Sequence, residues 1–198
     1  ISLAGLKEIF RAEKAGPRDI NLAEKYKFIL PTLAALGCMS LLTNADVILV
    51  KHFFTPVDAC AYSVAQLIGK IILFIPSAVY VVILPSVSGS HAQKKDSGAL
   101  LTKSLALTAV LCLGVAAVYN LFPEYILRSL TGKTGPDMVL LGRMFCAAMT
   151  FYSLTFVAAL YQLGVSRFGF LKLLGLFSFL QIAAIFMFHS SLEQVLII

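Results

Sequence analysis

The residues from Phe28 to Val50 read FILPTLAALGCMSLLTNADVILV, and this stretch decides the class of fold. It is apolar almost throughout and contains one charged residue, Asp46. The hydrocarbon core of a bilayer is about 30 Å thick, which a helix of about 20 residues crosses. A spanning strand needs only about 9–11 residues and alternates polar with apolar positions, unlike this stretch. The sequence therefore predicts a transmembrane helix here.

Four further stretches have the same length and character. They are Tyr62–Leu84, Leu101–Phe122, Met138–Leu163 and Phe168–Phe188, and another apolar run begins near Ser191. Apolar residues make up 59% of the chain and charged residues 13%, against about 45–50% and about 25% in soluble domains. A soluble core would not bury this excess. We therefore predict an all-α polytopic membrane bundle with about five complete transmembrane helices.

The two ends of the chain suggest a larger molecule. The chain begins at Ile1 without a methionine, and its last apolar run is still short at Ile198. We expect residues 1–27 to hold the end of a preceding helix and a cytoplasmic linker. Residues 28–198 are expected to form the transmembrane bundle, including the start of a sixth helix at residue 191.

Prolines and small residues predict where these spans stop, bend or touch. Pro85 and Pro123 are expected to close the second and third spans, because proline lacks an N–H and ends or kinks helices. Pro76 lies inside the second span, so a kink is expected there. Small residues such as Gly37 and Gly114 would let neighbouring helices approach closely.

The basic residues predict the orientation in the membrane. Eleven fall on one side: Lys7, Arg11, Lys14, Arg18, Lys25, Lys27, Lys94, Lys95, Lys103, Arg167 and Lys172. Four fall on the other: Lys51, Arg128, Lys133 and Arg143. Because cytoplasmic loops are enriched in Lys and Arg, the N-terminal segment is expected in the cytoplasm and the protein in the cell (inner or plasma) membrane. The same rule accounts for the net charge of +6 without a nucleic-acid partner.

Lys70 is the most informative polar residue, since it lies eight residues into the second span. A lysine near the bilayer centre costs about 2.5–3.5 kcal/mol, so it should face the bundle interior. Other polar residues recur with it at helical spacing and predict one polar stripe. They are Tyr62, Gln66, Ser77 and Tyr80. Two interpretations remain open: a cation that lines a substrate cavity, and a structural partner of another helix.

Asn44 and Asp46 lie in the last turns of the first span. Asp46 is placed to meet Gln66 or Lys70 across the first hairpin. Its carboxylate is either a polar group at a helix end or a group that couples transport to a proton or Na⁺. The candidate cavity residues are therefore Lys70, Gln66, Tyr62, Asp46, Asn44 and Ser77.

The sequence contains no complete motif for enzyme chemistry among those considered. Gly132-Lys133-Thr134 is similar to the end of a phosphate-binding P-loop, but Leu127 stands where that motif needs glycine. His52, His91 and His189 are scattered, and the four cysteines form no CxxC pair. We therefore expect neither an enzyme, nor a metal site, nor a cofactor.

Several short motifs between Asn44 and Ser88 together resemble a known family of membrane proteins. This stretch reads NADVILVKHFF at its start, continues through YSVA and ends at LPSVS. This order resembles polysaccharide biosynthesis proteins and lipid-linked oligosaccharide flippases of the multidrug/oligosaccharidyl-lipid/polysaccharide exporter superfamily. The segment Leu121–Glu124 is similar to the outer-loop FPE segment of that family. Cys60 departs from it, since the family usually has glycine there.

The resemblance implies two six-helix bundles around a cavity with alternating access, of which this chain is the second. It implies a transporter that flips or exports a lipid-linked anionic oligosaccharide, with Lys70 suited to the phosphate. The expected partners are that oligosaccharide, membrane lipid and the N-terminal half of the same transporter. Two alternatives remain: a multidrug and toxin extrusion cation antiporter, whose cavity should be rich in carboxylates, and a membrane scaffold without a transport role.

Overall fold

The computed structural model describes residues 22–74, 76–92, 98–132, 135–188 and 191–197, and within these ranges it has eight helices and no strand. Five helices are long and apolar enough to cross a membrane, which confirms the predicted all-α membrane fold. They are α2 (Leu22–Phe53), α3 (Pro56–Phe74), α5 (Gly98–Leu121), α7 (Pro136–Gly164) and α8 (Phe170–Met187). The shorter helices are α4 (Ser77–Ala92), α6 (Pro123–Thr131) and α9 (Leu192–Ile197).

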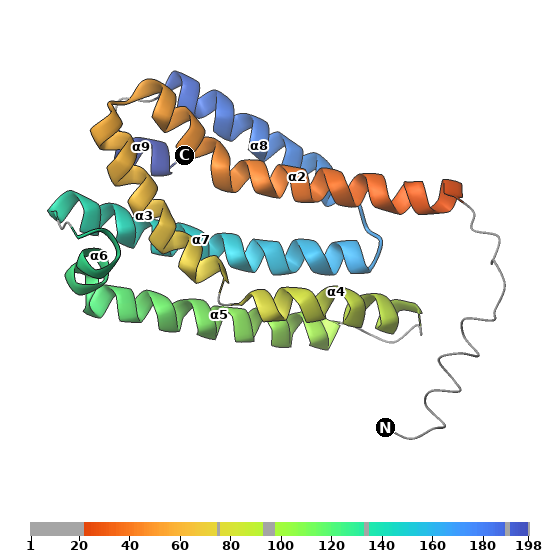
Figure 1. The fold of residues 1–198 in the computed structure, drawn as a ribbon. Coiled ribbons are helices and arrows are strands. Elements are labelled where there is room, and N and C mark those ends of the chain that lie inside the picture. The colour runs from red at the N-terminus through yellow and green to blue at the C-terminus, as the bar shows by residue number, and fades with distance from the viewer. Residues whose placement is uncertain (1–21, 75, 93–97, 133–134, 189–190, 198) are drawn as a thin grey trace, which may run out of the picture.

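The long helices lie roughly along one axis of the molecule (Figure 1). Along this axis α2, α5 and α8 run in one direction, and α7 runs in the other. Helices α3 and α4 follow each other in the direction of α7 and together make one pass (Figure 1). Helix α7 packs against α3, α4 and α5, while α2 packs against α8. The described residues therefore form five candidate passes, in the order predicted from the sequence.

The second predicted span, Tyr62–Leu84, is not one helix. Helix α3 already begins at Pro56 and ends at Phe74, and α4 begins only at Ser77. The expected kink at Pro76 is therefore a complete break between two helices. The ring of proline clashes with the carbonyl four residues earlier and removes one backbone donor. Helical hydrogen bonding begins again in α4, where the backbone N–H of Val79 donates to the Pro76 carbonyl at 2.8 Å.

The break leaves one backbone carbonyl without its ordinary helical donor, and another helix supplies a substitute. In an unbroken helix the carbonyl of Ile72 would accept from residue 76, which is proline and has no N–H. The Cys112 thiol of α5 instead donates to the Ile72 carbonyl, with an Sγ–O distance of 4.0 Å. Neighbouring helices can satisfy freed backbone groups within a membrane in this way.

Two other expected helix ends had different outcomes. Pro123 does separate two helices, since α5 ends at Leu121 and Pro123 is the first residue of α6. Proline suits that position because the N–H it lacks would have no helical acceptor. The prediction for Pro85 was wrong, because it lies inside α4, which continues to Ala92. Membrane helices tolerate an internal proline where neighbouring groups satisfy the freed backbone.

Close helix contacts use glycines that the sequence did not single out. A Cβ on Gly69 of α3 would lie 2.9 Å from the Met149 side chain of α7. A Cβ on Gly164, the last residue of α7, would lie 2.8 Å from the Val87 side chain of α4. Gly37 and Gly114 have no such neighbour within 4 Å, so the expectation that they bring helices together was wrong. Both glycines are exposed among the described residues.

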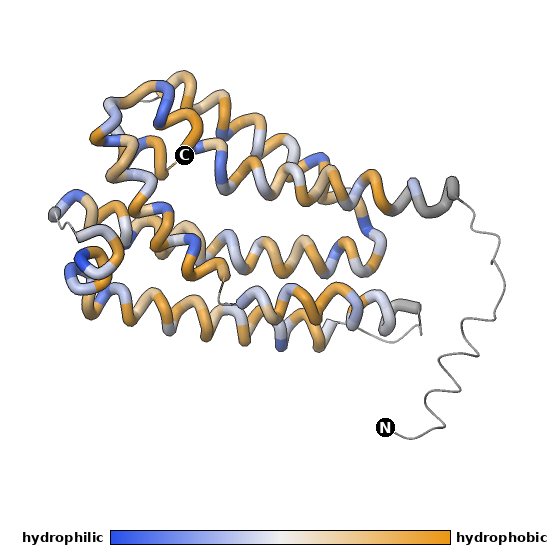
Figure 2. Tube along the Cα trace, in the orientation of Figure 1, coloured by the Kyte–Doolittle hydropathy of each residue, from blue (hydrophilic) through white to orange (hydrophobic). Residues whose placement is uncertain are grey.

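Large apolar side chains cover the outer surface of the bundle. Figure 2 shows hydrophobic residues along most of the length of the long helices. Leu30, Ile48, Val110, Phe151 and Phe179 each expose between 65% and 72% of their surface. Such a surface is typical of helices that face lipid. Residues 1–21, Lys95 and Lys133, on which the predicted linker and part of the predicted orientation depend, lie outside the described residues.

Candidate functional site

A layer of buried polar side chains joins α2 to α3. Thr43 and Asp46 are three residues apart and so lie on one face of α2, while Tyr62 and Gln66 are four apart and share a face of α3. All four side chains are less than 9% exposed. The turn between Phe53 and Pro56 brings the two faces together. Polar groups that are buried at membrane depth need internal partners.

Asp46 is the centre of this layer. The Tyr62 hydroxyl donates to the Asp46 carboxylate at 3.0 Å, and the Gln66 side-chain amide donates to it at 3.1 Å. Gln66 also donates to the Thr43 backbone carbonyl at 2.9 Å. The Tyr62 ring meets the Phe145 ring of α7 edge to face, with the ring centroids 5.0 Å apart. The predicted contact of Asp46 with Gln66 across the first hairpin is confirmed.

Lys70 and Asn44 form a separate pair beside this layer. The Lys70 ammonium donates to the side-chain oxygen of Asn44 at 3.0 Å. The Asn44 amide in turn donates to the Ser40 carbonyl at 2.8 Å. Both Lys70 and Asn44 are partly buried. Lys70 therefore lies near the middle of the α3–α4 pass, with an uncharged hydrogen-bond acceptor.

The break at Pro76 divides the predicted polar stripe. Tyr62, Gln66 and Lys70 stay together on α3, whereas Ser77 and Tyr80 belong to α4. The side chain of Ser77 is exposed and does not join the Asp46 layer. A stripe argued from helical spacing requires one continuous helix, and that condition fails here.

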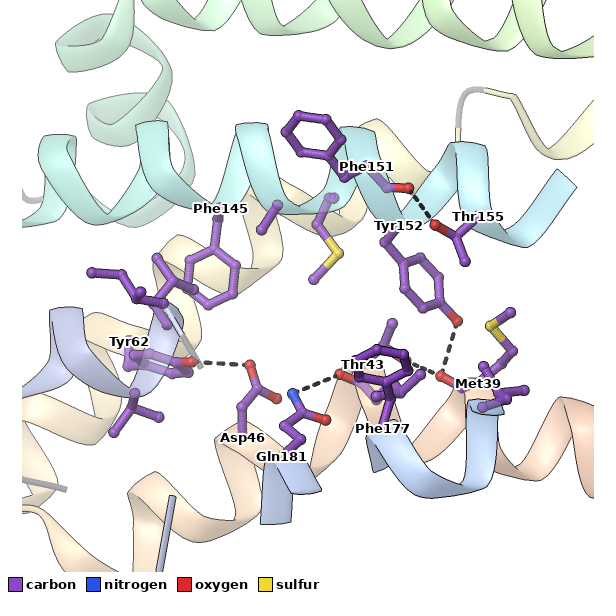
Figure 3. Close-up of a pocket in the computed structure, with 17 residues that line it drawn as sticks. Met39, Thr43, Asp46, Tyr62, Phe145, Phe151, Tyr152, Thr155, Phe177 and Gln181 are labelled. Carbon is purple, nitrogen blue, oxygen red and sulfur yellow. Dashed lines mark hydrogen bonds between the residues drawn. The ribbon is translucent and has the colours of Figure 1, made fainter. Parts of the chain in front are cut away.

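A cavity of about 550 Å³ opens beside the Asp46 layer, between α2, α3, α7, α8 and α9. Asp46 and Tyr62 line it, and of the six candidate residues they are the two that do. Figure 3 shows the carboxylate and the tyrosine hydroxyl at one end of the lining. Aromatic and aliphatic side chains form most of the remaining wall. The aromatic ones are Phe145, Phe151, Tyr152 and Phe177.

Four other polar residues line this cavity and were not among the predicted site residues: Thr43, Tyr152, Thr155 and Gln181. Thr43 belongs to the same face of α2 as Asp46. Tyr152 of α7 donates its hydroxyl to the Met39 carbonyl at 2.9 Å (Figure 3). Gln181 of α8 donates to the Leu42 carbonyl at 3.2 Å, and its buried side-chain oxygen accepts no hydrogen bond among the described residues. A polar residue deep in the fifth span was the signal that could have identified Gln181.

The cavity can hold a small cation or a proton. It offers carboxylate, amide and hydroxyl oxygens at one end, and oxygen is the donor that hard cations prefer. Aromatic faces, which also attract cations, form part of the wall. Among the described residues, no group of three or more His, Cys, Asp or Glu side chains lies together as a transition-metal site would require.

Comparisons with known protein families, with curated proteins and with solved structures found no match to this chain. The class of protein therefore follows from the fold itself. Five long apolar helices with lipid-type outer surfaces make it a polytopic helical membrane protein. A buried carboxylate beside a cavity is the feature to be explained.

Proposed function

We propose that this chain is one half of a secondary transporter, in which Asp46 couples cargo movement to the binding of a proton or Na⁺. The cargo we propose is a lipid-linked anionic oligosaccharide, flipped by alternating access. The choice of cargo is supported by the resemblance of residues 44–88 to flippases and by Lys70. Lys70 is a partly buried cation near the middle of a pass, suited to a phosphate group.

The observation that carries the coupling role is the environment of Asp46. Its two side-chain donors, Tyr62 and Gln66, are uncharged. It lies seven residues before the end of α2, which corresponds to a depth of about 10 Å at 1.5 Å per residue. Lys70 acts on Asp46 electrostatically but donates its hydrogen bond to Asn44, so the carboxylate has no direct ion pair among the described residues. Such a buried carboxylate is costly at membrane depth, and a bound proton or Na⁺ removes that cost. Binding and release of one such ion can therefore shift the equilibrium between two states of the bundle.

The broken pass supports alternating access. Discontinuous helices are common near the binding sites of secondary transporters, since the two halves can change their relative angle. Here α3 carries the donors to Asp46, and α4 packs separately against α7. A change of angle between α3 and α4 would move Tyr62 and Gln66 relative to α4 without unfolding either helix.

One observation favours the cation antiporter as a second candidate. The cavity beside Asp46 is lined by a carboxylate and aromatic rings, while Lys70 lies outside its lining. This chemistry fits an organic cation better than an anion. The two candidates differ in cargo and assign different roles to Lys70, so transport assays separate them.

The test is transport by the intact transporter in proteoliposomes, with flipping of a fluorescent pyrophosphate-linked oligosaccharide lipid and uptake of ethidium measured in parallel. Under the flippase proposal Lys70→Gln abolishes flipping, and Lys70→Arg keeps part of it because the charge remains. Lys51→Gln, a substitution of an exposed lysine at the end of α2, is the matched control and should leave flipping unchanged.

Three results would decide against the flippase proposal. Full flipping by Lys70→Gln would remove the proposed role of the lysine. Ethidium uptake that survives Lys70→Gln but is lost in Asp46→Asn would support the cation antiporter instead. Absence of transport of either cargo would leave the scaffold as the better account.

A further inference from the structure

Two cavities adjoin each other in the seam between α7 and the α2–α8 pair. The cavity beside Asp46 has a smaller neighbour of about 260 Å³. The two cavities meet along the seam, because four side chains line both of them. These side chains are Met39, Thr155, Leu174 and Phe177. Helix α8 packs against α2, while α7 packs against α3, α4 and α5, which leaves room along the seam.

The smaller cavity extends this space toward the connection between α7 and α8. Gln162 lines it and lies two residues before the end of α7. Thr155 is seven residues earlier on the same face of α7, or about 10 Å along the helix. Figure 3 shows Thr155 toward one end of the larger cavity, and Asp46 with Tyr62 toward the other. The two cavities together therefore lead from the α7–α8 end of the bundle to Asp46.

Each cavity contains one buried amide oxygen that accepts no hydrogen bond among the described residues. The two oxygens belong to Gln162 in the smaller cavity and Gln181 in the larger one. An unsatisfied acceptor is costly at membrane depth. A cation with its water, passing along the seam, satisfies both oxygens in turn.

The hydroxyl groups of the lining also present acceptors to the seam, because their protons are used within the protein. Each of them donates to a backbone carbonyl or to the Asp46 carboxylate. These residues are Thr43, Tyr62, Tyr152 and Thr155. Their oxygens keep lone pairs for a ligand, and Asp46 adds a carboxylate. Such a set of oxygen acceptors favours a cation over an anion.

We propose that the two cavities form the path by which the coupling ion, with its water, reaches Asp46 from the α7–α8 side. The oxygens of Gln162, Thr155 and Gln181 are its successive contacts. The cavities of about 260 and 550 Å³ have room for several water molecules, since each occupies about 30 Å³ in the liquid. The inference rests on the proposed coupling role of Asp46, but the path itself can be tested without measuring transport.

A hydrocarbon chain of a lipid is the competing occupant, because the rest of the lining is apolar. Leu173 and Phe177 of α8 expose 56% and 54% of their surface and line the smaller cavity. A hydrocarbon chain has no donor, so it would leave the oxygens of Gln162 and Gln181 unsatisfied. The hydrated cation satisfies them, and the acceptors therefore favour it.

The experiment measures how fast single thiols in the seam react with methanethiosulfonate reagents in the intact, membrane-embedded transporter. In a cysteine-free background, Thr155→Cys and Ala158→Cys place the thiol in the lining. A trimethylammonium reagent and a sulfonate reagent are applied to one membrane face at a time, and each rate is divided by the rate with free mercaptoethanol. Arg167→Cys, in the α7–α8 connection, identifies the face. Val110→Cys, 67% exposed on α5 and outside both cavities, is the matched control.

Both thiols in the seam should react from the face that labels Arg167→Cys, and at least tenfold faster than Val110→Cys. The reason is that the reacting species is the thiolate, which forms in water and not in hydrocarbon. The normalised rate should be about tenfold higher for the cationic reagent, because the lining concentrates cations. Rates no faster than that of Val110→Cys would show that hydrocarbon fills the seam and would overturn the proposal. Reaction only from the opposite face, or equal normalised rates for the two reagents, would also overturn it.

A charge at position 162 tests whether Gln162 lies at the mouth of the path. Gln162→Lys should slow the reaction of the cationic reagent with Thr155→Cys by about tenfold, and Gln162→Glu should accelerate it. Thr102→Lys adds the same charge at an exposed position near the start of α5, outside both cavities, and should change the rate little. Equal effects of Gln162→Lys and Thr102→Lys would contradict the path. These rates do not depend on coupling by Asp46, so a failure of the path is distinguishable from a failure of the coupling role.

Discussion

Gly69→Ala, compared with Gly114→Ala, tests the contact that holds α3 against α7 behind the Asp46 layer. A Cβ on Gly69 would lie 2.9 Å from Met149 Cγ and 3.1 Å from Phe145 Cβ. Met149 is flexible and can yield, but Phe145 Cβ is fixed to the backbone of α7. The Phe145 ring also contacts Tyr62, so a shift there reaches the donor to Asp46.

The magnitude follows from two opposing effects. Replacement of glycine by alanine inside a helix stabilises it by about 1 kcal/mol, and this gain applies to both positions. Overpacking of a buried contact costs about 1–3 kcal/mol, and this cost applies only to Gly69. Gly114 has nothing within 4 Å of its added Cβ. We therefore expect Gly69→Ala to be less stable than Gly114→Ala by about 1–3 kcal/mol.

The assay is reversible unfolding in mixed micelles by titration with a denaturing detergent, followed by circular dichroism. The difference between the two variants cancels the common gain in helix propensity. Equal stability of the two variants, or a more stable Gly69→Ala, would show that α3 and α7 are not in close contact at Gly69.

Two further predictions concern the hydrogen bond to Asp46 and the orientation. Tyr62→Phe keeps the ring contact with Phe145 but removes the donor to Asp46. We therefore expect it to destabilise the protein by about 1–3 kcal/mol. Tyr125→Phe, at an exposed position, should leave the stability unchanged. Unchanged unfolding of Tyr62→Phe would contradict the bond. In a cysteine-free background, an impermeant maleimide applied outside the cell should label Glu124→Cys and spare Arg167→Cys. The reason is that the distribution of basic residues predicts a cytoplasmic α7–α8 connection. The reverse pattern would invert the orientation.

The number and order of the passes could be predicted because they depend on a simple length. Each pass needs an apolar run that matches the bilayer, and such runs are visible in the sequence without knowledge of packing. The break at Pro76 was predicted only as a kink. A proline signals a lost donor, but the extent of the disruption depends on partners such as Cys112, which lies 40 residues from Ile72 in the chain.

Only those contacts of the candidate site that lie within one hairpin were predicted from the sequence. Asp46 and Gln66 are 20 residues apart and belong to one hairpin, so their contact follows from the short connection. Tyr152 and Gln181 reach α2 from 113 and 139 residues away, and only the packing of α7 and α8 reveals them. The same limit applies to Gly69 and Gly114, because the sequence does not tell which face of a helix meets a neighbour.

Asp46 is proposed to be the coupling carboxylate of a transporter, and the ion dependence of transport tests this role. Flipping of the oligosaccharide lipid by reconstituted intact transporter should be recorded with and without imposed pH and Na⁺ gradients. Asp46→Asn preserves the size of the side chain but cannot be protonated or pair with a cation in the same way. We predict that wild-type flipping accelerates under one of the gradients and that flipping by Asp46→Asn does not respond to either. An equal response of Asp46→Asn and wild type would show that Asp46 does not couple ion binding to transport.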